Sequence, residues 1–317
     1  MRASGWSQGW HLPHLDAHPD AEIAAIVDPT FETAHWQGQG KGNHWSGGDF
    51  LNVDELGEKY GCPTFADVDD MVASGLEVDG VLVASNHATH AEIGIKVAAA
   101  GLHCMMEKPM TTDVPEAREL AAAADAGGKF FAVNNTANWR KNSQLAAEYV
   151  AAGEIGDVRH VNCYMGSPLG ALFEDPNAGG WVKPTGSAGM NGFGWGQLSH
   201  TLAWVFQVSG LEPVKVFSFM GLSEASGADI YDAGTVLCAN GALISVTGVA
   251  TLPVQAAVEG DVTTATKQVT QPLDRRPACA GHFSDLYCRD CRSTTKSSGR
   301  RARCSIPAWT SCRSLAT

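Results

Sequence analysis

The sequence predicts an α/β protein with two domains, the first built on a parallel sheet and the second on a mostly antiparallel one. Apolar runs alternate with helical patterns up to about residue 134, which is typical of parallel strands joined by crossover helices. Beyond that point strand patterns follow one another more closely, and Asn240-Gly241 lies between two of them as a hairpin signal. A chain of 317 residues is long enough for two hydrophobic cores.

Four apolar runs predict the strands of the first sheet. A short apolar run that stops at polar residues is typical of a strand buried in a parallel sheet. The runs are residues 22–28, which end in Asp28, and residues 80–85, 101–106 and 129–134.

Two helices are predicted between the later strands. In the first helix, Thr89 and Glu92 have the spacing of a capping box, and Gly101 closes the C-terminal end. The second helix spans about residues 115–126, with proline in its first turn and two glycines after its end.

The charged triplet Glu107-Lys108-Pro109 follows directly on a predicted buried strand. Because ligands of a parallel α/β sheet collect outside the carboxyl ends of its strands, Lys108 is expected to face a ligand. Pro109 has a fixed φ and no N–H to donate, so the strand ends there and the lysine lies on a stiff turn. The alternative interpretation is a solvated lysine that pairs with Glu107.

The remaining patterns define the second domain. Helices are expected over residues 143–152 and 196–210, and strands over residues 158–166, 214–221, 235–239 and 242–250. A Gly/Pro-rich loop covers residues 167–189, and residues 36–50 in the first domain look like a surface insertion.

Composition excludes several classes of function. The formal net charge of -12 argues against a nucleic-acid partner, because phosphate binding needs a clustered basic surface. No segment approaches the roughly 20 apolar residues that a membrane-spanning helix needs, and no apolar secretory segment follows Arg2. A soluble, cytoplasmic protein is therefore expected.

The C-terminal tail differs in composition from the rest of the chain. Residues 275–317 carry a charge of +7 against -19 for residues 1–274, and they hold five of the nine cysteines. We interpret the tail as translation in a shifted frame or a damaged gene end, without a packed fold. The pair Cys288-x-x-Cys291 could suggest zinc, but Cys304 and Cys312 are eight residues apart, which is the wrong spacing for a second pair.

Three stretches together resemble the Gfo/Idh/MocA oxidoreductases, over roughly residues 5–252. They are residues 78–110, which hold an Asn-x-x-x-His pattern and the Glu-Lys-Pro triplet, and residues 138–158 and 196–204. The resemblance implies a Rossmann domain that binds NAD or NADP. It also implies an α+β domain whose open antiparallel sheet closes over a sugar- or polyol-like substrate and mediates homo-oligomerisation. The implied domains are residues 1–133 and 134–258, followed by an aberrant, disordered tail at residues 259–317.

The resemblance also implies the residues of the site. The cofactor would be bound by Gly5, Trp6, Ser7, Asp28, Ser85, Asn86, His90 and Glu107. The substrate would be bound by Lys108, Arg140, Gln197 and His200, with no metal, although Arg140 could equally lie in an ion pair between the domains. Asp28 lies 23 residues after Gly5, near the spacing at which an acid binds the adenosine ribose, which favours NAD over NADP. The alternative is an aspartate that caps the next turn.

The sequence departs from the family pattern at both ends of the predicted site. The chain begins inside the glycine-rich turn, so the first strand of the Rossmann domain is expected to be missing. On the second-domain helix, Gly196 takes the place of the aspartate that many members have four residues before the histidine. Gln197, three residues before His200, is expected to share its helix face and orient the imidazole.

Lys108 and His200 suit the oxidation of a secondary alcohol. A charged, partly desolvated lysine can hold the hydroxyl oxygen, and a neutral imidazole can accept the proton. A structural histidine remains the alternative for His200. The sequence therefore predicts an NAD(P)-dependent dehydrogenase of sugar, polyol or inositol-like hydroxyls. A catalytically inert or cofactor-binding relative, and a family member that cleaves glycosides with the help of NAD, stay open as alternatives.

Overall fold

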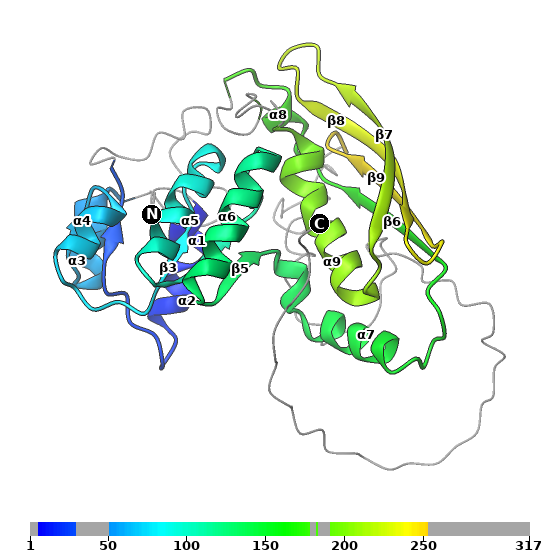
Figure 1. Ribbon diagram of the computed structural model, residues 1–317. Coiled ribbons are helices and arrows are strands. Elements are labelled where there is room, and N and C mark those ends of the chain that lie inside the picture. The colour runs from blue at the N-terminus through cyan, green and yellow to red at the C-terminus, as the bar shows by residue number, and fades with distance from the viewer. Residues whose placement is uncertain (1–5, 30–50, 178–181, 183–190, 253–317) are drawn as a thin grey trace, which may run out of the picture.

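The computed structural model describes residues 6–29, 51–177, 182 and 191–252. These residues form two halves, and no sheet is shared between them (Figure 1). The expectations for Gly5, for the insertion at residues 36–50 and for the tail fall outside the described residues.

The first half alternates helices with short strands, as the sequence predicts. Its elements are α1 (Trp6–Trp10), α2 (Leu12–Asp16), β1 (Ile26–Val27), α3 (Val53–Tyr60), β2 (Thr64–Phe65), α4 (Val68–Ala73), β3 (Gly80–Val83), η1 (His87–Thr89), α5 (His90–Ala99), β4 (His103–Glu107), α6 (Val114–Gly127) and β5 (Phe131–Asn134). Every strand pair in this half is parallel.

The parallel strands fall into two sheets instead of one, β1-β2 and β3-β4-β5. In the common doubly wound order, one further strand lies between the strands that correspond to β1 and β3. No strand among the described residues takes that place, so β1 and β3 each have one edge without a strand partner there.

Helix ends follow the local chemistry, with one exception to the prediction. Asn52 and Glu55 form the capping box that begins α3, since each side chain accepts from the other's backbone N–H. The capping box expected at Thr89 and Glu92 is absent: the Thr89 hydroxyl donates to the Asn86 carbonyl oxygen at 2.8 Å and makes no cap. Asn86 caps η1 instead, accepting from the N–H of Ala88.

The core of the first half lies between the sheet and the helices that cover it. Met106 of β4 and Leu120 of α6 are fully buried. A β-carbon at Gly94 of α5 would lie 2.6 Å from Leu120 and 2.7 Å from Met106. A side chain at Gly94 would therefore force the ends of the Leu120 and Met106 side chains to move within the core.

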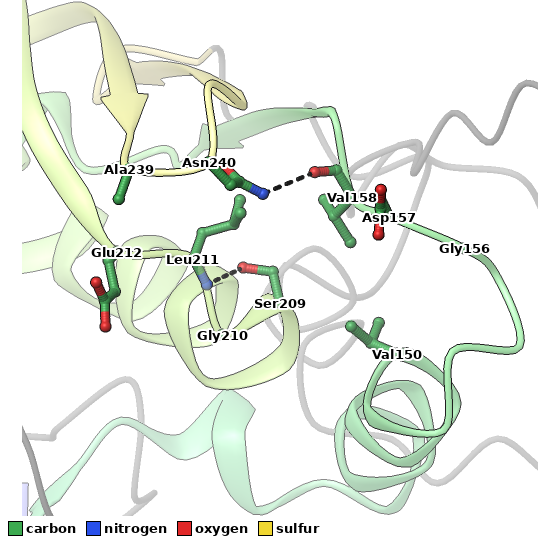
Figure 2. Close-up of a pocket in the computed structure, with 10 residues that line it drawn as sticks. All are labelled: Val150, Gly156, Asp157, Val158, Ser209, Gly210, Leu211, Glu212, Ala239 and Asn240. Carbon is green, nitrogen blue, oxygen red and sulfur yellow. Dashed lines mark hydrogen bonds between the residues drawn. The ribbon is translucent and has the colours of Figure 1, made fainter.

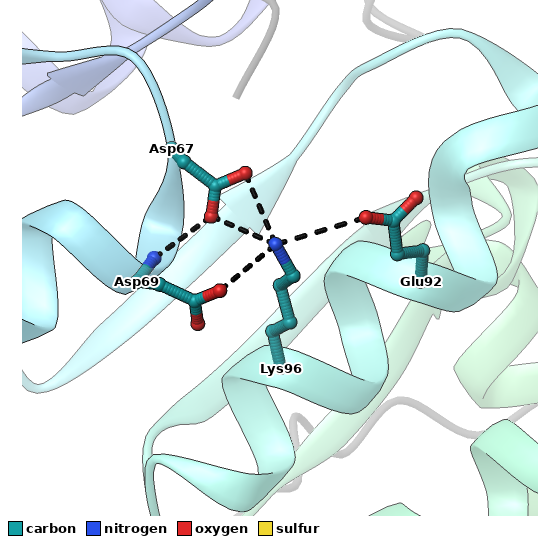
Figure 3. A network of polar contacts seen from close by, with 4 residues as sticks. All are labelled: Asp67, Asp69, Glu92 and Lys96. Atoms are coloured by element: carbon teal, nitrogen blue, oxygen red, sulfur yellow. Dashed lines mark hydrogen bonds and ion pairs between the residues drawn. The ribbon is translucent and has the colours of Figure 1, made fainter.

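A polar network on the surface ties α4 to α5 (Figure 3). The ammonium group of Lys96 lies 2.9 Å from a carboxylate oxygen of Asp67, 2.9 Å from one of Asp69 and 3.7 Å from one of Glu92. Hydrogen bonds to Asp67 and Asp69 raise the pKa of Lys96. The network fixes the first turn of α4 against the middle of α5.

The second half contains a four-stranded sheet and the helices beside it. Its elements are η2 (Thr136–Trp139), α7 (Lys141–Ala151), β6 (His160–Gly166), α8 (Gly170–Phe173), η4 (Gly194–Leu198, a π-helix), α9 (Ser199–Ser209), β7 (Pro213–Leu222), β8 (Asp229–Cys238) and β9 (Leu243–Val249).

The second sheet has the order β6-β9-β8-β7 and is mostly antiparallel. The predicted hairpin is present between β8 and β9, where Gly241 has a φ of 81° that suits glycine. The prediction of a mostly antiparallel sheet is confirmed. The pairing of β6 with β9 is the one parallel pair among the described strands of this sheet, and α8, α9, β7 and β8 intervene in the chain between these two neighbours. The predicted combination of a Rossmann-type α/β domain with an α+β domain is confirmed.

The two faces of this sheet differ in burial. The inner face of β6, β8 and β9 packs against α9 in a core that includes Val161, Val205 and Ile244. The outer face is left open and carries large apolar side chains. These are Tyr164, Phe217, Phe219, Tyr231, Leu237 and Leu243, which are 37% to 74% exposed.

None of the helices within the described ranges combines the length and the apolar character needed to cross a membrane.

Candidate functional site

Lys108 reaches from the first half to the second. It follows the last residue of β4, and its peptide bond to Pro109 is cis. Its ammonium group donates a 2.8 Å hydrogen bond to the carbonyl oxygen of Gly196 in η4. Burial lowers the pKa of Lys108 to about 8, although the nearby Glu107 carboxylate acts in the opposite direction. The lysine therefore lies between the two halves, as the sequence predicts, and its ammonium group is buried.

Glu107 holds the ends of three elements together. One carboxylate oxygen lies 2.7 Å from Nε2 of His11 and accepts from the side-chain amide of Asn134 at 2.7 Å. The other oxygen accepts from the backbone N–H of Lys108 at 3.1 Å. Burial would raise the pKa of Glu107, but His11, Asn134 and the charge of Lys108 outweigh it and leave this pKa lowered. Both oxygens are engaged within the protein, so Glu107 anchors the turn that carries Lys108.

His90 joins two of the loops at the carboxyl ends of the strands. Its ring is fully buried, with Nδ1 2.8 Å from the carbonyl oxygen of Pro109 and Nε2 3.2 Å from that of Ser85. Burial lowers the pKa of His90, so the ring is neutral and has one N–H, which we assign to the shorter contact at Nδ1. The arrangement indicates that His90 supports the Lys108–Pro109 turn from behind. The Ser85 hydroxyl accepts from that of Thr89 at 2.9 Å.

His87 is a further buried histidine, beside the predicted Asn86. Its ring packs edge-on against that of His90, with 5.8 Å between the ring centroids. Burial is the main reason that the pKa of His87 is lowered to about 3, followed by electrostatic interactions with the His90 ring and with the ammonium group of Lys108. Nδ1 lies 3.3 Å from the side-chain oxygen of Asn191, which belongs to the second half of the chain.

His200 lies in the first turn of α9 and faces the same group of side chains. Burial lowers its pKa to about 3, and the positive charge of Lys108 is the next cause, followed by smaller effects of Glu107 and Arg140. The imidazole is therefore neutral at pH 7 and can accept a proton, with weak basicity. Its Nδ1 atom is enclosed and has no hydrogen-bond partner among the described residues.

The expected contact between Gln197 and His200 is not among the hydrogen bonds of the described residues. The reason is local geometry: Gly194–Leu198 forms a π-helix, and α9 begins only at Ser199. In the wider turn of a π-helix, side chains three positions apart no longer share a face as they do in an α-helix. Single turns of π-helix occur frequently at functional sites.

Arg140 immediately precedes α7 and is half-buried. Burial lowers its pKa, and its positive charge contributes to the lowered pKa of His200. The structure therefore brings Lys108, Arg140 and His200 into one electrostatic cluster, together with His87.

The predicted cofactor residues lie on the first half at the matching edge. Ser7 in α1 is fully buried, and Asp28 directly follows β1 with 1% of its surface exposed. Trp6 begins α1. An acid at the carboxyl end of this strand fits the ribose-binding position of a dinucleotide site. Its burial adds an observation that suits NAD, because a 2′-phosphate beside a buried carboxylate would be repelled.

A separate pocket lies away from these residues (Figure 2). It has a volume of about 340 Å³ and lies where α7, α9 and the β8–β9 turn come together. Its lining includes Val150, Leu211 and Asn240 and none of the predicted site residues. We therefore do not assign the substrate to it.

Two buried aspartates lie behind η4. Asp229 accepts a short hydrogen bond from the N–H of Gly194. Burial and, next, the charge of the nearby Asp229 raise the pKa of Asp232 to about 7. Gly192 and Gly194 lie so close to these carboxylates that a β-carbon at Gly192 would be 2.0 Å from an Asp229 oxygen. The pair therefore positions the segment that leads to His200.

Within the described part of the chain, no group of three or more His, Cys, Asp or Glu side chains could hold a metal ion. The cysteine pattern of the tail lies outside that part.

Fold and site together define a two-domain protein of the dinucleotide-binding type. Residues 4–135 match the family described as "Oxidoreductase family, NAD-binding Rossmann fold", and residues 143–264 match the Gfo/Idh/MocA C-terminal domain. The chain belongs to the Gfo/Idh/MocA oxidoreductases. The family and its NAD-binding Rossmann domain were both predicted from the sequence and are confirmed.

The relatives include one protein named for rhizopine catabolism and one named for the reduction of a dTDP-linked sugar. The rhizopine catabolism protein MocA of Rhizobium meliloti is 32% identical over 147 residues, 45% of this chain and 39% of that protein. The dTDP-3,4-didehydro-2,6-dideoxy-alpha-D-glucose 3-reductase of Actinomadura kijaniata is 29% identical over 148 residues, which are 47% of this chain and 39% of that protein. This chain spans about half the length or less of the curated relatives that it matches first.

The fold is shared with solved structures at low sequence identity. The WlbA dehydrogenase of Bordetella pertussis, solved with NADH and UDP-GlcNAcA, superimposes with a TM-score of 0.62 and 20% identity. The match covers 78% of this chain and 65% of that one.

Sequence reasoning missed His11, His87, Asn134 and Asn191. Asn134 ends one predicted strand and His87 lies two residues after another. Their place at the ligand edge of the sheet could therefore have been predicted from the sequence. His11 and Asn191 had no comparable signal, because each is placed by a contact across about 100 residues: 96 for His11 with Glu107, and 104 for Asn191 with His87.

Proposed function

We propose that this protein is an NAD-dependent oxidoreductase that transfers a hydride between a secondary hydroxyl carbon of a sugar, polyol or inositol-like substrate and nicotinamide. One observation carries the proposal. Lys108, at the mouth of the parallel sheet, donates a 2.8 Å hydrogen bond to the carbonyl oxygen of Gly196, which lies on the opposite half four residues before His200. The names of the relatives support a carbohydrate-like substrate.

The chain supplies the binding and proton-transfer groups of this reaction. NAD, when bound, supplies the hydride acceptor. Lys108 would leave the Gly196 carbonyl and donate to the substrate hydroxyl, where its charge stabilises the developing alkoxide. His200 would accept the hydroxyl proton, and Arg140 would hold a further oxygen of the substrate. Asp28 would bind the adenosine ribose, with Ser7, Ser85 and Asn86 along the edge of the cofactor site.

His90 and Glu107 have supporting parts in this proposal. Their hydrogen bonds fix the turn that aims Lys108 at the second half. A near-attack geometry depends on such rigid placement, because a displacement of about 1 Å can cost two orders of magnitude in rate.

The open outer face of the second sheet supports a homo-oligomer. Phe217 and Phe219 of β7 are 71% and 74% exposed, and they are continuous with Tyr231 and Leu237 on β8. An apolar face of this kind on a sheet typically marks an interaction surface. We propose that a second copy of the chain covers it.

Light scattering after size exclusion tests the oligomer. We expect wild type to elute as a dimer or larger assembly, and the double substitution Phe217→Lys with Phe219→Lys to elute as a monomer. Val72→Lys, at an exposed position on α4, is the matched control and should keep the wild-type mass. A monomeric wild-type protein would contradict the proposal.

The enzymatic proposal is tested in two stages. Energy transfer from tryptophan to NADH should report saturable cofactor binding. NAD is then combined with a panel of myo-inositol, free hexoses and UDP-N-acetylglucosamine, and absorbance at 340 nm should rise with at least one of them. Binding of NADH without turnover on any panel member would favour a relative that binds the cofactor but does not react, and no binding of NADH would favour an inert protein.

A further inference from the structure

The side-chain amide of Asn191 is only partly hydrogen-bonded among the described residues. Asn191 is 4% exposed and lies three residues before η4. Its side-chain nitrogen is enclosed and has no hydrogen-bond partner among the described residues. Buried amide nitrogens are satisfied in most proteins, so an exception of this kind points to a missing partner such as a ligand.

His87 determines which way the amide faces. The side-chain oxygen of Asn191 can only accept, so the contact at 3.3 Å requires the hydrogen on Nδ1 of His87. A neutral His87 ring with the hydrogen on Nδ1 is consistent with its burial. The bond holds the amide oxygen on the side of the first half and leaves the two N–H groups of Asn191 for another acceptor.

A second enclosed atom lies in the same cluster. Nδ1 of His200 also has no partner among the described residues. The ammonium group of Lys108 donates to the carbonyl oxygen of Gly196, which lies in the chain between Asn191 and His200. The Lys108 ammonium, the His200 ring and the amide anchored on His87 therefore belong to one region between the halves.

We propose that Asn191 is a substrate-binding residue that donates to an oxygen on the carbon next to the reacting one, and that His87 is the residue that positions it. The inference rests on the proposed function. In this arrangement Lys108 and His200 both contact the reacting hydroxyl, and Asn191 donates a hydrogen bond to the oxygen on the adjacent carbon. The site then selects substrates with oxygen on two adjacent carbons and discriminates against those with a single hydroxyl.

The test compares a substrate with its deoxy analogue in wild type and in variants. The substrate is the panel member oxidised with the highest kcat/KM, and the analogue lacks the hydroxyl next to the reacting carbon. Wild type should lose about 10- to 100-fold in kcat/KM on the analogue. Asn191→Ala should lose a similar factor in kcat/KM on the full substrate. On the analogue its kcat/KM should be close to that of wild type, because the analogue already lacks the hydroxyl that Asn191 would bind.

Further variants separate binding from folding. Asn191→Asp keeps an acceptor for His87 but has no N–H to donate, so it should behave like Asn191→Ala. His87→Ala should raise KM for the full substrate. The ratio of kcat/KM on the full substrate to kcat/KM on the analogue should be smaller in this variant than in wild type. Asn142→Ala removes an exposed amide on α7 and should leave every constant near wild type. All variants should bind NADH with a Kd within about threefold of wild type.

Three results are distinguishable. If wild type binds NADH and oxidises its substrate, but has the same kcat/KM on the analogue, the inference about Asn191 is overturned while the proposed function stands. An Asn191→Ala protein with wild-type kcat/KM overturns it in the same way. If wild type oxidises no panel member, the proposed function fails first, and the inference falls with it.

Discussion

Replacing Asp232 by asparagine should stabilise the protein, and the gain should grow with pH. The pKa of Asp232 is raised to about 7 in the folded protein, against 3.8 for the ordinary side chain. Between these two pH values the folded state holds a proton that the unfolded state has already released. The stability that this proton contributes is therefore full below pH 3.8, falls as the pH rises and is lost above pH 7. A difference of about three pH units corresponds to about 4 kcal/mol.

An amide cannot ionise, so Asp232→Asn removes this loss. The free energy of unfolding of the variant should exceed that of wild type by about 1.5 kcal/mol at pH 5 and by about 4 kcal/mol at pH 8. Urea titrations at pH 5, 6, 7 and 8 measure the difference, and the acid-sensitive contributions of His87 and His200 cancel in it. Asp157→Asn, at a side chain that is 80% exposed, is the control and should change nothing. An Asp232→Asn gain that is the same at every pH, or a loss at pH 8, would refute the reasoning.

Three further results are expected. His200→Ala should lower kcat/KM about 10²- to 10⁴-fold while NADH binding is kept, and an unchanged rate would exclude it as proton acceptor. Because the pKa of Lys108 is about 8 and that of His200 about 3, kcat/KM for oxidation should be constant from pH 5 to 7 and fall above pH 8; a rise through pH 8 would assign the base role to neutral Lys108. Lys96→Met should lower the free energy of unfolding by about 1 kcal/mol at low salt and by less at 1 M salt, and equal losses at both would contradict an ionic network.

The sequence carried most of the information on the first half. Strands β3, β4 and β5 and helices α5 and α6 were predictable because buried parallel strands are apolar throughout and helix ends have their own residues. The placement of Lys108 followed from the same logic, since the carboxyl end of a parallel strand is the ligand edge.

Local patterns could not predict contacts across the chain. The parallel pairing of β6 with β9 depends on how the intervening elements pack, and the loss of the Thr89 cap depends on Ser85 and Asn86 competing for its hydroxyl. The π-helix at Gly194–Leu198 is also hidden in sequence, and it is the reason that spacing alone misplaced Gln197 relative to His200.

Removal of the Lys108 amine is the most direct test of whether the two halves meet over a reacting hydroxyl. Lys108→Ala should bind NADH with a Kd within about threefold of wild type, while its kcat/KM on the best panel substrate falls about 10²- to 10³-fold, as expected for a lost oxyanion-stabilising group. Lys129→Ala, at an exposed lysine before β5, should match wild type in both measurements. A Lys108→Ala protein that turns over at the wild-type rate would contradict the account.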